Sequence, residues 1–296
     1  MQRATQLSFL EPVQEKPSIV NVASVPQRSL FRYPGGKTWL VPYIRRWLTS
    51  QPVPLNKFFE PFAGGAIVGL TVAFEKLASH VTLVELDEQV AAVWQTILRG
   101  EAEWLAQRII SFEMSPERVD EELAKSAEST DELAFQTILK NRVNRGGILA
   151  PGAGKVKQGE NGKGLASRWY PSTLRQRILD IIAIRERISF LQADGISVIE
   201  QHVQQPATAF FIDPPYTAGG KRAGSRLYRY SEIDHQKLFH VVSEVKGDFL
   251  MTYDDAPEVR ALARQYNFDT QLVPMKSTHH AEMFELLIGR NLDWAR

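Results

Sequence analysis

The tetrapeptide Asp213-Pro214-Pro215-Tyr216 combines side chains that could hold a planar amine. It follows an apolar run at 209–212, so the sequence predicts that it lies where a buried strand ends and a loop begins. Asp213 supplies an acceptor carboxylate, and the prolines leave carbonyls with no competing N–H on the same residue. Tyr216 offers a flat face for stacking. These properties suit methyl transfer to an exocyclic amine of a base; the structural alternative is a strand that ends in a proline-rich turn.

A second group of residues is typical of a nucleoside-binding site. Gly64 and Gly65 follow the first predicted strand, and a glycine-rich turn lets a ligand approach the backbone at a helix N-terminus. Glu60 lies just before that turn, where a carboxylate repels a pyrophosphate but attracts a sulfonium. This charge favours S-adenosylmethionine over a dinucleotide. Glu85 ends the next predicted strand and can accept from ribose hydroxyls, with Asp87 as the alternative.

The segment Gly35-Gly36-Lys37-Thr38 resembles a phosphate-binding loop only in part. Such a loop needs a glycine five residues before Gly36, and Phe31 occupies that position. A Gly-Gly turn with a lysine can still clamp a carboxylate, and the methionine part of the cofactor carries one.

The elements that must position these residues follow an alternating pattern. Strands are expected at 57–62, 80–86, 188–192, 209–212 and 248–252, with a terminal pair at 268–274 and 283–288. Helices are expected at 66–77, in several segments from 88 to about 140, at 172–187 and from about 234, with a glycine-rich hairpin or loop at 146–164. The pattern predicts an α/β fold with a doubly wound, mostly parallel sheet, interrupted by a helical and loop-rich insertion.

Composition narrows the chemistry. The chain of 296 residues contains no cysteine, which excludes disulfides, thiolate zinc sites and methylation of a base carbon through cysteine attack. His279 and His280 have no third ligand at a suitable spacing, so no metal site is predicted. No apolar run is long enough to span a bilayer and no secretory signal is visible, so we expect a cytoplasmic protein without membrane contact.

Charge is unevenly distributed although the net charge is only +1. Residues 101–132 hold ten acids and three bases, whereas residues 140–187 hold eleven bases and three acids. The basic block fits contact with a polyanion, and the alternative is a pair of solvated faces that partly neutralise each other. A glycine-rich basic loop at 217–230 is expected to close over a bound base. The candidate DNA contacts are Arg142, Arg145, Lys155, Lys157, Arg168, Lys221 and Arg222.

The order of four sequence blocks resembles the Dam-type, α-class DNA adenine-N6 methyltransferases. The blocks are Tyr33-Pro-Gly-Gly-Lys37, Glu60-Pro-Phe-Ala-Gly-Gly65, Glu85-Leu-Asp87 and Asp213-Pro-Pro-Tyr216. The resemblance covers roughly residues 30–290. It implies a Rossmann-like methyltransferase sheet with a DNA-recognition segment between the cofactor strands and the last block.

The resemblance implies methyl transfer from S-adenosylmethionine to the N6 amine of an adenine flipped out of a specific double-stranded DNA sequence. The implied catalytic residues are Asp213, Pro214, Pro215 and Tyr216. The expected cofactor contacts are Tyr33, Lys37, Glu60, Phe62, Gly64, Gly65, Glu85, Asp194 and Asp213. The expected organisation is an N-terminal tail at 1–28, a catalytic domain at 29–100 and 176–296, and a target-recognition insertion at 101–175.

Several points stay open in the sequence. Tyr33-Pro34 stands where the family often has Trp-Ala, and the insertion, with Asn141 to Ile148 and Gly164 to Pro171, departs from the GATC-specific pattern, so the target sequence is not predicted. The alternatives are methylation of the cytosine N4 amine, of RNA or of a protein glutamine, and a catalytically inactive DNA-binding module. A monomer is expected, and a restriction endonuclease acting on the same site would be a separate protein.

Overall fold

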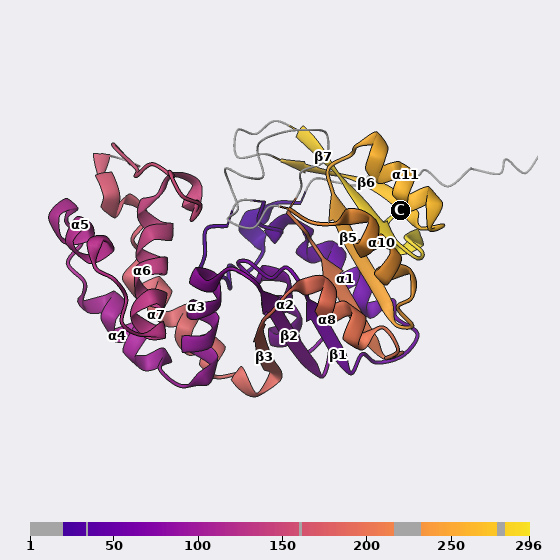
Figure 1. The fold of residues 1–296 in the computed structure, drawn as a ribbon, viewed down its shortest axis with the longest axis horizontal. Helices are drawn as coiled ribbons and strands as arrows, with labels where there is room; N and C mark the ends of the chain where they lie inside the picture. Colours follow the sequence, from indigo (N-terminus) through magenta and orange to yellow (C-terminus); the bar gives the residue numbers. More distant parts are fainter. Residues whose placement is uncertain (1–19, 34, 160–161, 216–231, 277–281) are drawn as a thin grey trace, which may run out of the picture.

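The computed structural model describes residues 20–33, 35–159, 162–215, 232–276 and 282–296 (Figure 1). One sheet of seven strands forms its centre, with the order β3-β2-β1-β4-β5-β7-β6. The strands are β1 (Lys57–Glu60), β2 (His80–Glu85), β3 (Ile188–Gln192), β4 (Thr208–Ile212), β5 (Asp248–Tyr253), β6 (Asp269–Lys276) and β7 (Glu282–Gly289). The first five pair in parallel, and β7 runs antiparallel to both β5 and β6. The predicted α/β fold with a mostly parallel sheet is confirmed.

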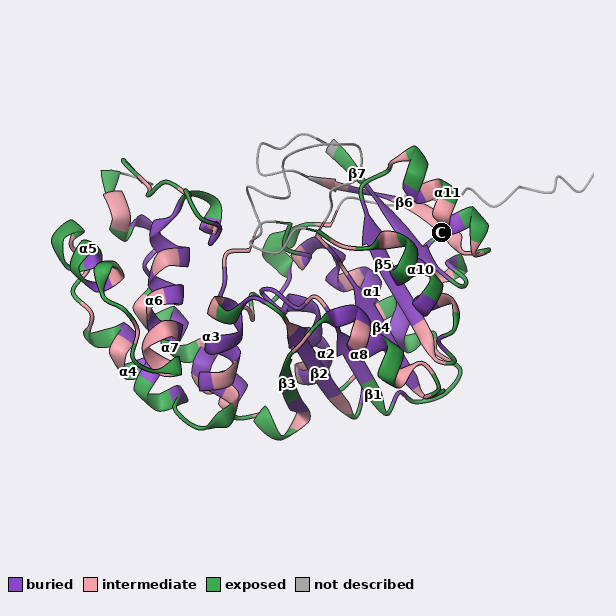
Figure 2. Cartoon of the chain, viewed as in Figure 1, coloured by how far each residue is buried: buried purple, intermediate pink, exposed green. Residues whose placement is uncertain are grey.

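Helices cover both faces of the sheet because successive strand residues point to opposite sides. Phe58 and Phe59 show this alternation, since each belongs to a different core cluster. One cluster packs α1 (Val41–Thr49), α2 (Ile67–Glu75) and α3 (Glu88–Arg99) on the sheet. The other packs α8 (Gly195–His202), α10 (His235–Ser243) and α11 (Pro257–Gln265) on the opposite face. Figure 2 shows the central strands β1, β4 and β5 as mostly buried between the two layers, whereas the edge strand β3 is partly exposed.

A group of helices between β2 and β3 extends to one side of the sheet (Figure 1). Its members are α4 (Ala102–Ser111), α5 (Pro116–Ala124), α6 (Thr130–Val143) and α7 (Pro171–Ile182). Here α3 packs on α6, and α4 packs on α7. The helix breaks are set locally, because Ser115 and Ser129 each accept an N–H from their own helix and so cap α5 and α6.

Several predicted boundaries are wrong. The helix expected to reach residue 187 ends at Ile182, and a separate 3-10 turn, Arg185–Arg187, leads into β3. For the glycine-rich stretch at 146–164 the sequence leaves a hairpin or a loop open; its described part is irregular, and one bridge joins Lys155 to Asn144, the residue after α6. Helices α8 and α11 were not predicted, because each is short and each follows a strand within a few residues.

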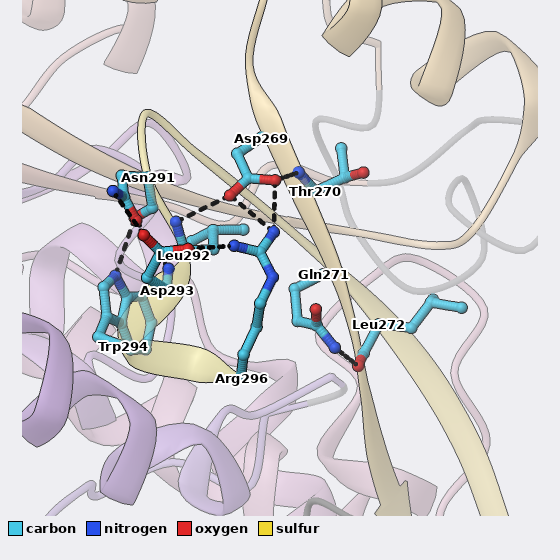
Figure 3. Close-up of polar contacts among 9 residues, drawn as sticks. All are labelled: Asp269, Thr270, Gln271, Leu272, Asn291, Leu292, Asp293, Trp294 and Arg296. Atoms are coloured by element: carbon cyan, nitrogen blue, oxygen red, sulfur yellow. Dashed lines mark hydrogen bonds and ion pairs between the residues drawn. The ribbon is translucent and has the colours of Figure 1, made fainter. Parts of the chain in front are cut away.

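The terminal hairpin β6–β7 is tied to the end of the chain (Figure 3). Arg296 places Nη2 2.7 Å from Oδ1 and 2.8 Å from Oδ2 of Asp269, the first residue of β6. The Leu292 N–H donates to the same carboxylate at 3.0 Å. The side chain of Asp269 therefore joins the start of β6 to the segment after β7.

Within the described residues, no helix is long and apolar enough to cross a membrane. The same part of the chain contains no group of three or more acidic, histidine or cysteine side chains arranged to hold a metal ion.

Candidate active site

The carboxyl ends of β1 and β4 lie side by side at the centre of the sheet. These two parallel strands are neighbours although β2, β3 and the whole helical group separate them in sequence. The connections on either side of this point run in opposite directions, which opens a ligand crevice at this edge in doubly wound sheets. Glu60 is the last residue of β1, and Asp213 follows β4 directly. The fold thus brings together the two acids that the sequence predicted for cofactor and amine.

Lys37 connects this edge to the far part of the sheet. Its Nζ lies 3.0 Å from Oδ1 of Asp213 and 2.9 Å from Oε1 of Glu285 on β7, and it donates to the Gly35 carbonyl at 3.1 Å. Lys37 and Glu285 are each only 4% exposed. Burial alone would lower the pKa of Lys37, but Asp213 and Glu285 together raise it above its ordinary value. The two carboxylates therefore favour the charged form of Lys37.

Asp213 is held from a second side by β5. The Thr252 hydroxyl donates to Asp213 Oδ1 at 2.8 Å, so Lys37 and Thr252 approach the same oxygen. The next residue, Tyr253, is buried, and burial together with Asp213 raises the pKa of its phenol. Its hydroxyl lies 3.0 Å from Nδ1 of His235, whose pKa is lowered by burial. The carboxylate orientation of Asp213 is thus fixed by residues of two other segments.

Glu60 is a buried acid beside these groups, with a side chain turned toward α2. Its Oε2 accepts the Gly69 N–H at 2.7 Å, and no cation among the described residues pairs with it. Burial raises its pKa well above the ordinary value, and the charges of Asp213 and Glu85 act in the same direction. A Cβ on Gly69 would lie 2.6 Å from this carboxylate and 2.5 Å from Leu83, so the close approach needs glycine.

Glu85 organises the glycine-rich turn. One of its oxygens accepts the Gly64 N–H at 2.9 Å, and the other accepts the N–H groups of Leu86 and Asp87. Burial raises its pKa although these N–H groups oppose the shift. The ring of Tyr33 lies on Gly64, where an added Cβ would approach it to 2.6 Å. Tyr33 and Glu85 therefore both contact the glycine-rich turn at this edge of the sheet.

The remaining predicted cofactor residues lie along the same edge. Asp87 and Asp194 begin helices: Asp87 accepts the Gln89 N–H at 2.8 Å and Asp194 accepts the Ser197 N–H at 2.8 Å, so both carboxylates serve as N-caps. Phe62 lies against Gly195, whose added Cβ would approach its ring to 3.1 Å.

The predicted DNA contacts differ in accessibility. Arg145 and Lys157 are exposed, and Lys155 pairs with Asp120. Arg142 is 4% exposed and donates to the Leu30 carbonyl, so its side chain is built into the protein and does not offer a surface contact. Arg168 is half-buried. Tyr216, Lys221, Arg222 and the pair His279-His280 lie outside the described residues.

Glu285 and Thr252 were missed in the sequence. Glu285 stands inside the apolar run Met283 to Ile288, and a lone acid in a predicted buried strand is the signal that could have identified it. Thr252 carried no comparable signal, because threonine is common in strands.

Comparison with known proteins gives one family match and several distant structural likenesses. Residues 33–145 match the family model of the D12 class N6 adenine-specific DNA methyltransferase. No curated protein matches the chain.

The solved structures include a SAM-dependent methyltransferase from Agrobacterium tumefaciens (9% identity, TM-score 0.40), and the alignment covers 86% of this chain and 61% of that one. The chain thus spans less than two thirds of that relative's length. The rRNA methyltransferase aviRa from Streptomyces viridochromogenes shows 12% identity over 87% of this chain and 85% of its own, with a TM-score of 0.40. A precorrin-6y C5,15-methyltransferase from Geobacter metallireducens shows 8% identity over 85% and 86%, with a TM-score of 0.34.

Proposed function

Because residues 33–145 match the D12 class of N6 adenine-specific DNA methyltransferases, we propose that the chain belongs to this family and catalyses a specific reaction of it. It transfers a methyl group from S-adenosylmethionine to the N6 amine of an adenine flipped out of a specific double-stranded DNA sequence. One observation carries the proposal. Lys37, which lies in the matched segment, forms an ion pair with Asp213. Asp213 lies outside that segment and is the first residue of the tetrapeptide that would hold the amine.

The charges of the crevice fit this cofactor. S-adenosylmethionine supplies, when bound, a methyl group on a positively charged sulfonium, together with an amino group and a carboxylate. Glu60 is a buried acid without a cationic partner among the described residues, so it suits a positively charged part of that ligand. Tyr33, Gly64 and Glu85 line the turn beside it and would hold the nucleoside part.

The tetrapeptide would hold the adenine amine. The Asp213 carboxylate and the Pro214 carbonyl would accept the two N6 hydrogens, which directs the nitrogen lone pair toward the methyl group. Because Lys37 and Thr252 fix Asp213 before any substrate arrives, the acceptors need no reorganisation during transfer. Tyr216 would stack on the extruded base, which offsets part of the few kcal/mol that flipping costs.

The helical group between β2 and β3 would carry target recognition. Arg145 and Lys157 are exposed on its glycine-rich connection and suit contact with the DNA backbone. Lys221 and Arg222 would act from the loop that follows the tetrapeptide. The protein would act as a monomer on DNA in the cytoplasm.

Single-molecule sequencing of plasmid DNA tests the reaction. Plasmid from methylase-free cells that express the chain should carry N6-methyladenine at nearly every copy of one short motif. Modified cytosine in place of adenine would reassign the chain to N4 methylation. Unmodified plasmid from cells with folded, S-adenosylmethionine-binding protein would contradict the proposal.

Asp213→Ala provides the matched variant. We expect methylation to fall below detection, because the amine loses an acceptor, while S-adenosylmethionine binding measured by calorimetry changes little. Near-wild-type turnover of the purified variant would remove Asp213 from the reaction.

A further inference from the structure

A cluster of arginines lies around residues 29–32, the segment that leads into the first sequence block. We define the arginine cluster as Arg32, Arg142 and Arg177, with Arg168 adjacent. No carboxylate among the described residues pairs with Arg32, Arg142 or Arg177. Guanidinium groups that are partly buried without a counter-charge are unfavourable in an isolated protein.

The cluster is built by the segment that leads into the first sequence block. The buried side-chain amide of Asn141 clamps the backbone of Arg32: its oxygen accepts the Arg32 N–H at 2.9 Å and its nitrogen donates to the Arg32 carbonyl at 3.0 Å. Arg142 donates to the Leu30 carbonyl, and Arg177 donates to the Ser29 carbonyl at 2.6 Å. The backbone of residues 29–32 is therefore fixed between α6 and α7.

The guanidinium groups remain electrostatically unsatisfied. Burial lowers the pKa of Arg32, Arg142 and Arg177; Arg168 lowers that of Arg32 further, and Arg177 and Arg32 lower that of Arg142. Nε of Arg142 is buried and has no hydrogen-bond partner among the described residues. Arg32 has no side-chain hydrogen bond to another described residue, is half-buried, and keeps access to solvent.

The position of the cluster links it to the crevice. Ser29, at one end of the fixed segment, donates its hydroxyl to the carbonyl of Gly65 in the glycine-rich turn. Tyr170, which is 48% exposed, lies close enough to affect the charge of both Arg32 and Arg142. Arg32 and Arg177 are only half-buried, so the cluster reaches solvent at the boundary between the helical group and the carboxyl-terminal edge of the sheet.

We propose that Arg32 and Arg177, which are half-buried, bind a backbone phosphate of the substrate DNA at this boundary, and that the buried Arg142 adds positive charge behind them. The inference rests on the proposed function and adds a phosphodiester site made by residues 32 and 177, which the sequence did not identify. A phosphodiester supplies the missing negative charge and accepts the fork of N–H groups that arginine presents. It would also tie the position of the DNA strand to the segment that carries Tyr33 and Lys37.

The salt dependence of DNA binding tests the site. The variant is Arg32→Gln, because the Arg32 side chain has no bond to another described residue and its loss should leave the fold intact. The control is Arg175→Gln, an exposed arginine on α7 two residues before Arg177. Binding to methylatable duplex is measured from low to moderate salt, and S-adenosylmethionine binding checks that each variant is folded.

We expect Arg32→Gln to weaken DNA binding several-fold and to reduce the salt slope of log K by about one, as the loss of one phosphate contact requires. Arg175→Gln should retain the wild-type slope. If wild-type protein binds and methylates DNA but Arg32→Gln keeps the wild-type salt slope, the phosphate site is overturned and the proposed function stands. Wild-type protein that neither binds nor methylates DNA overturns the proposed function.

A second measurement separates DNA from free phosphate. Inorganic pyrophosphate is titrated into wild-type protein and both variants. Pyrophosphate binding that depends on Arg32, combined with DNA binding that does not, would assign the cluster to a free anion and overturn the DNA phosphate site. Competition between pyrophosphate and duplex in wild type, lost in Arg32→Gln, supports it.

Discussion

Lys37 shows how one buried residue can join distant sequence blocks. Its ammonium group contacts Asp213 and Glu285 at 3.0 and 2.9 Å in a nearly closed environment. An isolated lysine at this depth would lose its charge, but two carboxylates keep it protonated. Glu285 pairs with Lys37, which in turn pairs with Asp213, so we regard Glu285 as a positioning residue that acts through Lys37.

A double-mutant cycle checks that role. We expect Glu285→Gln to lower kcat on the order of 10- to 100-fold, with a smaller change in the KM for S-adenosylmethionine. The reason is that Lys37 would shift and its ion pair with Asp213 would weaken. In a Lys37→Met background the same change should have little further effect. If the effects of Glu285→Gln and Lys37→Met on kcat are additive, Glu285 does not act through Lys37. If the loss of kcat only follows a fall in melting temperature, Glu285 merely stabilises the fold.

Glu60 should make the ligand-free protein sensitive to pH. Its pKa is raised mainly by burial, so the folded state holds a proton that the unfolded state releases as pH rises. The free energy of unfolding therefore falls as the pH rises above the ordinary pKa of glutamate, and it stops falling once the pH exceeds the raised pKa of Glu60. Glu60→Gln keeps an acceptor for the Gly69 N–H and avoids the loss.

We expect the melting temperature of Glu60→Gln to equal that of wild type in acid and to exceed it increasingly toward neutral pH. S-adenosylmethionine affinity should fall at the same time, since the attracting charge is gone. The control is Glu113→Gln, an exposed acid without a side-chain bond in the described region. A constant difference at every pH would show that Glu60 is not the titrating group.

At the scale of elements, the strands were more predictable than the short helices. The boundaries of β3 were predicted to the residue, because Ile188 to Gln192 stands between two charged or turn-forming segments. Helix α8 begins at the capping residue Asp194, whose carboxylate the sequence predicts for the cofactor. The same carboxylate type serves both purposes, so sequence alone does not separate them.

The hairpin β6–β7 is the element that delivers Glu285, and its anchor can be tested separately. Burial acts to raise the pKa of Asp269, but Arg296 and the Leu292 N–H lower it below the ordinary value. Asp269 therefore stabilises the fold above its unfolded pKa, and this contribution is lost as pH falls. The pair is partly exposed, so we estimate its contribution at roughly 0.5–1 kcal/mol.

We expect Arg296→Ala to lower the melting temperature by about 1–4 °C near neutral pH and by less in acid. Arg264→Ala, which removes an exposed arginine without a partner in the described region, is the control and should change little. Equal shifts in the two variants, or a shift that grows in acid, would exclude the anchor.

At the scale of the molecule, sequence predicted which blocks meet but not the contacts that join them. Four blocks and an alternating pattern were enough to predict the mostly parallel sheet. They could not reveal that Lys37 bonds to Asp213, that Glu285 completes the pair, or that Arg142 is buried. Such contacts depend on the order β1-β4-β5-β7, and strand order is set by long-range packing that no local pattern records.

The same strand order has a consequence for how the chain folds. Strand β1 is synthesised early, yet one of its two neighbours in the sheet is the much later β4. Lys37 can pair with Glu285 only after β7 has been synthesised. Pairings of such long sequence separation form slowly. A ribosome-bound chain that lacks β7 would therefore display an unfinished sheet, and chaperone dependence during synthesis should end only when the last hairpin emerges.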